Sequence, residues 1–155
     1  MRFPQGYHLT WGTYGARLHG SAKPFVDRGH NEYGAPLPAP DPAREQAARD
    51  RMREDPVTLT VEQRKEVEAA IEDVCAQYGW TIHSKASQSD HTHVVVTAPR
   101  VGEELRDALK ACATRALNKK FGKRTWWAEG GSARYLWERQ YFLNAVRYVR
   151  DQRDW

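Results

Sequence analysis

Two histidines, His91 and His93, stand one residue apart at the head of the apolar run HTHVVVT. Side chains at positions i and i+2 of a strand point to the same face, with Cα atoms roughly 6.5–7 Å apart. Imidazole is a common metal ligand in proteins, so the pair could share one metal ion. An exposed strand face also tolerates histidine, and the pair by itself leaves a plain strand and a metal site about equally open.

A second polar group lies in the last periodic segment, QYFLNAVRYVRDQ. Tyr148 and Gln152 are four residues apart, so a helix would place them on one face, in a polar stripe with Tyr141 and Asn144. A separate apolar stripe, suited to docking, consists of Phe142, Ala145, Val146 and Val149. A polar stripe on a final helix is usually its solvated side, so this pattern is weak evidence of chemistry.

The elements that must position these residues follow from hydrophobic periodicity and turn residues. They are expected in the order strand, insertion, helix, two strands, helix, hairpin and helix. The insertion, at about 15–56, is rich in Gly, Pro and charge, and a short helix is expected within it around 42–53. The remaining predicted ranges are 7–14, 58–79, 80–88, 91–98, 101–122, 124–137 and 138–155. In the segment 58–79, Thr60 and Gln63 resemble a capping box that starts the helix, and Gly79 ends it.

This order favours a single α+β domain over residues 1–155, a ferredoxin-like sandwich with an antiparallel sheet, helices on one face and a C-terminal helix that bears the tyrosine. Strand alternation divides the sheet into two faces. The apolar face, to be covered by the two amphipathic helices, takes Leu9, Trp11, Trp80, Ile82, Val94 and Val96. The polar face takes His8, Thr10, His83, Lys85, His91 and His93, and therefore four of the six histidines.

Charge and composition restrict the partners. The net charge is +4, and the basic residues are concentrated in residues 101–155, which predicts a polyanionic partner. Apolar runs are too short for a membrane span, and the N-terminus lacks the apolar core of a signal peptide. Cys75 and Cys112 form no CxxC motif, which favours buried thiols in a reducing cytoplasm. We therefore expect a cytoplasmic protein with no membrane partner.

The segments DHTHVVV and YVRDQ together resemble the motifs of the HUH single-stranded DNA nucleases. They look like those of the single-tyrosine (Y1) transposases of the IS200/IS605 type and their REP-associated relatives. The segments HLTWGTYGARLHG and ARYLW are also similar to this group, so the resemblance covers most of the chain outside the insertion. One departure is Thr92, because the family usually has a bulky apolar residue between the two histidines.

The resemblance implies a metal-dependent endonuclease and strand transferase that cleaves hairpin-associated single-stranded DNA. His91, His93 and Gln152 would bind Mg²⁺ or Mn²⁺, and Tyr148 would form a 5′-phosphotyrosine link. The resemblance also implies a homodimer, in which the tyrosine helix of one subunit often completes the active site of the other. The location would be the bacterial cytoplasm, in association with the nucleoid. Tyr141 matches no catalytic position and is expected to pack or to contact DNA.

Contacts to DNA are expected from basic and aromatic side chains. Four aromatic residues could stack on bases, although at least half of them are expected in the core: Trp126, Trp127, Tyr135 and Trp137. The predicted basic contacts are Arg17, Lys85, Lys119, Lys120, Lys123, Arg124, Arg134 and Arg147.

Three other functions compete with this interpretation. The 2H phosphoesterases need two His-x-Thr/Ser motifs; HLT at 8–10 fits one, but HTH at 91–93 supplies no second. RNA-binding ferredoxin-like domains carry a Gly-aromatic signature on a central strand, which HTHVVVTA lacks. A domesticated family member that binds or processes a host hairpin without transposition stays open, since the same four site residues would serve it.

Overall fold

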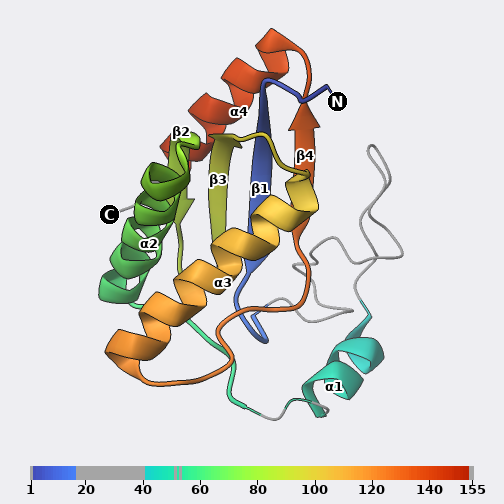
Figure 1. Cartoon of the computed structure of the whole chain (residues 1–155). Helices are drawn as coiled ribbons and strands as arrows, with labels where there is room; N and C mark the ends of the chain where they lie inside the picture. The colour runs from blue at the N-terminus through green and yellow to red at the C-terminus, as the bar shows by residue number, and fades with distance from the viewer. Residues whose placement is uncertain (1, 17–40, 51, 53, 154–155) are drawn as a thin grey trace.

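The computed structural model describes residues 2–16, 41–50, 52 and 54–153. Four strands form one antiparallel sheet in the order β2-β3-β1-β4 (Figure 1). The strands are β1 (Gly6–Gly12), β2 (Thr81–Ser87), β3 (His91–Thr97) and β4 (Ser132–Leu136). The helices are α1 (Pro42–Asp50), α2 (Val61–Tyr78), α3 (Gly102–Phe121) and α4 (Arg139–Gln152). This α+β arrangement confirms the predicted fold class.

Helices α2 and α3 cover one face of the sheet, called here the α2/α3 face (Figure 1). The core beneath them contains the predicted apolar face of the strands, with Ile82 only partly buried. Helix α2 begins where predicted, because Thr60 and Gln63 cap each other's backbone amides, and it ends at Gly79 in a left-handed conformation. Both cysteines are free thiols, Cys75 buried and Cys112 half-buried.

Helix α4 docks on the opposite face, called here the α4 face. Its apolar stripe makes a second, smaller core with residues of β2, β3 and the end of β4. The buried members are Ala86, Val95, Leu136, Phe142, Ala145 and Val149, with Val146 packed against them. The predicted apolar stripe of this helix is therefore confirmed, and its docking leaves the two helical layers on opposite sides of one sheet.

A β-bulge in β2 contradicts the predicted placement of Lys85. Ile82 pairs with Val96 but Ser84 pairs with Val95, so one extra residue is inserted and the facing of every later residue is reversed. Lys85 then pairs with Val94 and forms an ion pair with Glu72 of α2. Lys85 lies on the α2/α3 face, and strict alternation failed because it assumes an unbroken strand.

The predicted hairpin at 124–137 is only half formed. Its second half is β4, whereas the first half makes a single bridge between Thr13 and Trp127. Lys110 of α3 donates to the carbonyls of residues 128 and 130, and Arg106 donates to that of Gly131. The backbone of residues 126–128 bonds to residues 12–14 rather than to β4, so the first half pairs elsewhere and no hairpin forms.

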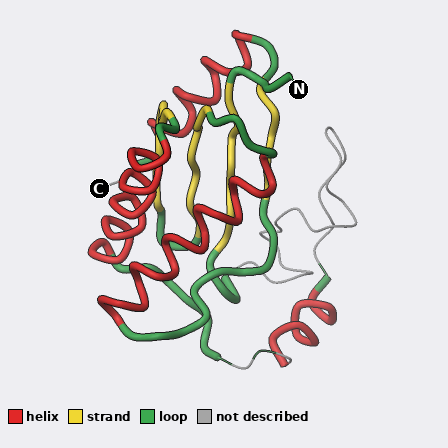
Figure 2. Tube along the Cα trace, in the orientation of Figure 1, coloured by secondary structure: helices red, strands yellow, loops and turns green. Residues whose placement is uncertain are grey.

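Helix α1 confirms the short helix expected within the insertion, and it lies to the side of the two layers (Figure 2). The rest of the insertion, at 17–40, falls outside the described residues. None of the described helices combines the length and apolar composition that crossing a bilayer requires.

Candidate active site on the α4 face

His91 and His93 point to the α4 face, as alternation along β3 predicts. Their ring centroids are 4.6 Å apart and the rings are nearly perpendicular, at 88°. His93 is buried, with 7% of its surface exposed, while His91 is half-buried. Thr92 between them is buried on the other face, where its hydroxyl lies 3.1 Å from that of Ser87. The departure at position 92 is therefore accommodated by a local hydrogen bond.

His91 has a carboxylate partner that determines which of its two ring nitrogens carries a proton. Its Nδ1 lies 2.6 Å from Oδ1 of the preceding residue, Asp90. An ionised carboxylate only accepts hydrogen bonds, so Nδ1 of His91 must carry the proton in this contact. In a neutral ring the lone pair is then on Nε2, which is the nitrogen that can bind a metal ion.

His93 is held by two neutral groups of β1 instead. Its Nδ1 lies 3.1 Å from Nε2 of His8 and 3.0 Å from Oγ1 of Thr10. Burial, and to a smaller extent the charge of Arg134, its neighbour across β1 and β4, together lower the pKa of His8 to about 4. His8 is therefore uncharged at neutral pH, and the polar cluster beneath the site consists of neutral groups.

Tyr148 of α4 joins the histidines on this face. Its ring is edge-on to His93, with centroids 5.7 Å apart at 90°, and its centroid lies 6.1 Å from that of His8. These separations are those of packed aromatic pairs. Because 52% of Tyr148 remains exposed, the side chain contacts the histidines and is also accessible to a large substrate. The structure thus places Tyr148 beside His93 and His8 of the same chain.

Gln152 lies one helical turn after Tyr148 and is linked through Gln88 to the start of β3. The main-chain carbonyl of Gln152 accepts a hydrogen bond from the side-chain amide of Gln88. The main-chain N–H of Gln88 in turn donates to the carbonyl of His91, at 2.8 Å. Next to it, Arg153 forms an ion pair with buried Glu68 of α2, at 3.2 Å. The end of α4 is therefore tied to β3 and α2 of its own chain.

The donor types on this face fit a divalent cation. Two imidazole nitrogens and one amide oxygen are ligands that Mn²⁺ and Mg²⁺ accept, with nitrogen favouring Mn²⁺. The described part of the chain holds no cluster of three or more His, Cys, Asp and Glu side chains suited to a metal ion. A metal at His91 and His93 would consequently need the Gln152 amide as its third protein ligand.

The predicted DNA contacts divide between the two faces. Exposed Arg134 lies beside His8 on β4, and exposed Arg147 directly precedes Tyr148 on α4. Four others lie on or just after the last turn of α3, in the other helical layer: Lys119, Lys120, Lys123 and Arg124. Lys85 lies on the α2/α3 face as well, and Arg17 is outside the described residues.

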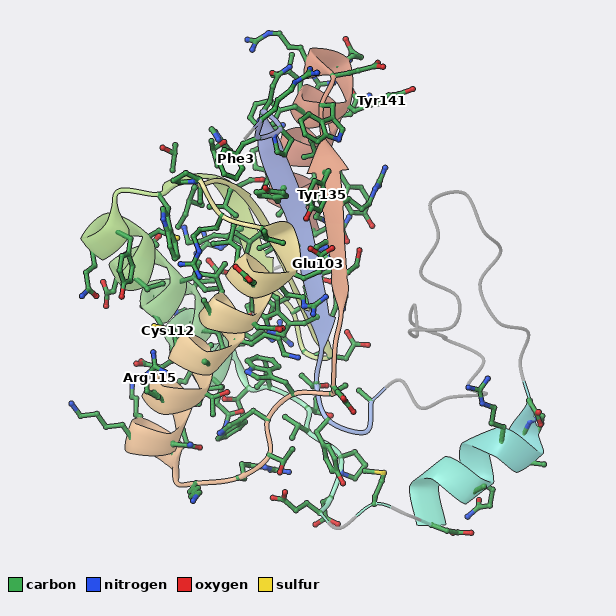
Figure 3. All side chains as sticks on the ribbon, turned by 45° about the vertical axis from the view of Figure 1, so that its right-hand side comes forward. Phe3, Glu103, Cys112, Arg115, Tyr135 and Tyr141 are labelled. Carbon is green, nitrogen blue, oxygen red and sulfur yellow. The ribbon has the colours of Figure 1, made fainter. Side chains whose placement is uncertain are left out.

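Half of the four candidate stacking residues belong to the core. Trp126 and Trp127 are buried under α3, whereas Trp137 is exposed. Tyr135 is partly buried, and its hydroxyl donates to Glu103 at the start of α3 (Figure 3). Tyr141 is exposed in the first turn of α4 and projects outward (Figure 3).

Sequence patterns placed His8 and Thr10 on the correct face but assigned them no role, and they assigned none to Asp90. The signal for Asp90 was its position directly before the first histidine. The contact of His8 and Thr10 with His93 depends on the β1–β3 register, in which Thr10 pairs with His93, and no local pattern encodes that register.

Comparison with known proteins places these features in context. The family model described as "Transposase IS200 like" matches residues 51–153 of the 155. No curated protein sequence matches the chain significantly.

Two solved structures are similar to the chain. One is a candidate transposase from Deinococcus radiodurans R1, 14% identical, with a TM-score of 0.53 over 100% of this chain and 95% of that chain. The other is a REP-associated tyrosine transposase bound to a REP hairpin, 12% identical, with a TM-score of 0.54 over 96% of this chain and 68% of that chain. At these identities the two structures show that the fold is shared.

Proposed function

Since the chain belongs to the family of IS200-like transposases, we propose that it breaks and rejoins single-stranded DNA through a covalent link to Tyr148. The packing of the Tyr148 ring against His93 is the observation that carries this proposal. A half-exposed tyrosine packed against one of the candidate metal ligands is suited to attack on a phosphodiester.

The proposed step is a transesterification. The Tyr148 oxygen attacks phosphorus and loses its proton, while the bond from phosphorus to the 3′ oxygen breaks and that oxygen takes up a proton. The products are a 5′-phosphotyrosine and a free 3′-OH, so the number of phosphate ester bonds is unchanged. A DNA 3′-OH can then reverse the step and rejoin strands without an external energy source.

His91, His93 and Gln152 would hold Mg²⁺ or Mn²⁺, which when bound would polarise the scissile phosphate and offset charge on its oxygens. All three ligands are neutral, so the charge of the cation would remain directed at the phosphate. His93 and His8 would meanwhile limit the orientations of the Tyr148 ring through their packing against it. A well-oriented nucleophile lowers the entropic cost of attack.

The proposed substrate is a single strand next to a DNA hairpin. The solved relative bound to a REP hairpin supports this class of DNA. Arg134 and Arg147, which flank the histidines and Tyr148, are our leading phosphate contacts near the reacting group. The basic residues after α3 lie in the other helical layer, so a hairpin stem reaching them would have to pass round the molecule.

We further propose that each tyrosine acts on its own chain's histidine pair. Three connections support this: the core between α4 and the sheet, the bond from Gln88 to Gln152, and the ion pair of Arg153 with Glu68. A homodimer stays a prediction from family resemblance, but its two sites would each be built within one subunit.

The test is a covalent-adduct assay with labelled single strands carrying hairpins of varied sequence, with Mn²⁺ or Mg²⁺. We expect a protein–DNA adduct that survives SDS, that EDTA prevents and that Tyr148→Phe abolishes. Tyr141→Phe is the matched control, since Tyr141 is equally exposed on the same helix and should leave the adduct intact. An adduct that forms with Tyr148→Phe but is lost with Tyr141→Phe would show that Tyr141 is the nucleophile, and it would contradict the proposal.

A further inference from the structure

His93, His8 and Thr10 form a closed polar triangle under the candidate metal site. The Nδ1 atom of His93 contacts both other groups, and Thr10 Oγ1 also lies 3.4 Å from His8 Nε2. Thr10 pairs with His93 across β1 and β3, and both histidines are only 7% exposed. The sheet register therefore brings the three side chains together, and the burial of both histidines restricts their movement.

Which nitrogen of His93 carries the proton decides whether the ring can serve as a ligand. A neutral imidazole has one N–H and one lone pair, and only the lone pair binds a metal ion. At His91 the Asp90 carboxylate requires the proton on Nδ1. Nδ1 of His93 is engaged by His8 and Thr10, so this ring can bind a cation only through Nε2, and it too then needs its proton on Nδ1.

We propose that His8 and Thr10 are positioning residues that hold His93 as its Nδ1–H tautomer and fix the plane of its ring. His93 Nδ1–H donates to this pair, the lone pairs of His8 Nε2 and Thr10 Oγ1 accept, and Nε2 of His93 becomes the metal-binding atom. Partners of this kind, behind the ligands themselves, commonly orient metal-binding histidines. This inference rests on the proposed function, because it assumes that His93 binds the metal.

His8 also links this positioning to the nucleophile. Its ring contacts that of His93 and packs against Tyr148, with centroids 5.2 Å and 6.1 Å away. The Thr10 hydroxyl meets the two imidazoles of the triangle, so variants at the two positions separate the effects. Removal of the His8 ring should disturb the packing of Tyr148, and it should disturb His93 as well where the new side chain offers no acceptor. Removal of the Thr10 hydroxyl should disturb only His93.

The test measures Mn²⁺ binding to the full chain by electron paramagnetic resonance, without DNA. Thr10→Val combined with His8→Leu should weaken binding by about tenfold to a hundredfold, the usual loss when such orienting partners are removed. His8→Gln alone should stay within about threefold of wild type, because its amide oxygen can accept where Nε2 did. His83→Gln is the control, since His83 lies on the same face but bonds to Thr97, away from the triangle.

A second readout is the tautomer itself, from nitrogen–proton correlation spectra of imidazole-labelled protein. Wild-type His93 should be the Nδ1–H form, and the double variant should show a mixture of both forms. An Nε2–H form in wild type would overturn the inference, as would a double variant that binds Mn²⁺ like wild type. If the double variant does not fold, Thr10→Val, His8→Gln and the wild-type tautomer decide the question.

Failure of the proposed function would look different. His91→Ala should abolish Mn²⁺ binding if the metal site is correct, and it leaves the His93 triangle untouched. If His91→Ala binds Mn²⁺ like wild type, the proposed metal site is wrong. If His91→Ala loses binding and the double variant does not, only the positioning role is wrong.

Discussion

The two faces of the sheet differ in what they bury. The α2/α3 face carries a continuous apolar core that includes Leu9, Trp11, Val94 and Val96. The α4 face has a smaller apolar cluster beside a group of buried polar side chains, His8 and His93 among them. Strand alternation sends neighbouring residues of β1 and β3 to opposite faces, so each strand contributes to both.

This difference indicates a division of labour. Burial of apolar area provides most of the free energy of folding, and the α2/α3 face has most of that area. The α4 face needs only enough apolar contact to dock one helix, and it can therefore accommodate polar groups whose hydrogen bonds are satisfied within the cluster. Variants on the two faces should then affect different observables.

The largest effect is expected for His91→Ala on the α4 face. Loss of a metal ligand should lower the rate of adduct formation on the order of 10³-fold, since metal stabilisation of the phosphate is worth several kcal/mol. The free energy of unfolding should change by no more than about 1 kcal/mol, because His91 is half-buried outside both apolar cores. Rate assays and chemical denaturation on the same samples measure both quantities. A large loss of stability would contradict the division of labour between the two faces.

Leu109→Ala on the α2/α3 face should show the reverse pattern. Leu109 is fully buried, so truncation should lower the free energy of unfolding by about 2–5 kcal/mol. Adduct formation per folded molecule should stay within about twofold of wild type, because the other face is unchanged. Leu143→Ala is the matched control on exposed α4 surface and should change stability by about 0.5 kcal/mol or less.

The smallest effect is a pH dependence at Glu68, which connects the two layers. Burial raises the pKa of this carboxyl above 4.5, against the opposing hydrogen bond from Ser87 and the charges of Arg153 and Lys85. The folded state therefore binds a proton more readily than the unfolded chain, and this contribution to stability declines as pH rises from 4.5 through the raised pKa.

Glu68→Gln removes the titration but keeps an acceptor for the Ser87 amide. The free energy of unfolding of wild type minus that of Glu68→Gln should fall with pH across this window, as measured by denaturation at a series of pH values. A difference that rises with pH would mean that the Arg153 ion pair outweighs the cost of burial.

The fold was largely predictable because local patterns encode it. Alternation along β1 and β3 assigned His8, Thr10, His91 and His93 to one face, and the capping residues of α2 marked where that helix begins. Lys85 was misplaced because a bulge depends on how two strands pair, which one strand's sequence does not reveal. The first half of the predicted hairpin was misassigned because its backbone bonds to residues 12–14, more than a hundred residues earlier in the chain, which no local pattern encodes.

The residues of the candidate site were predicted from motifs, whereas the contacts between them come from the structure alone. HTH and YVRDQ identified His91, His93, Tyr148 and Gln152, and the structure adds the ring contact between Tyr148 and His93. The contacts that hold these groups in place join β1 to β3, α4 to β3 and the end of α4 to α2. Such long-range contacts depend on how the strands and helices assemble, so no local sequence motif could predict them.

The most direct test of the central claim asks whether one chain contains the whole site. His91→Ala and Tyr148→Phe are each expected to be inactive, and the two variants are co-expressed so that any dimers form as mixed species. Our account predicts no adduct from the mixture, while wild type co-expressed with the double variant should retain activity in proportion to its wild-type chains. Adduct formation by the mixture of single variants would contradict it, because a tyrosine would then be serving the histidines of a second chain.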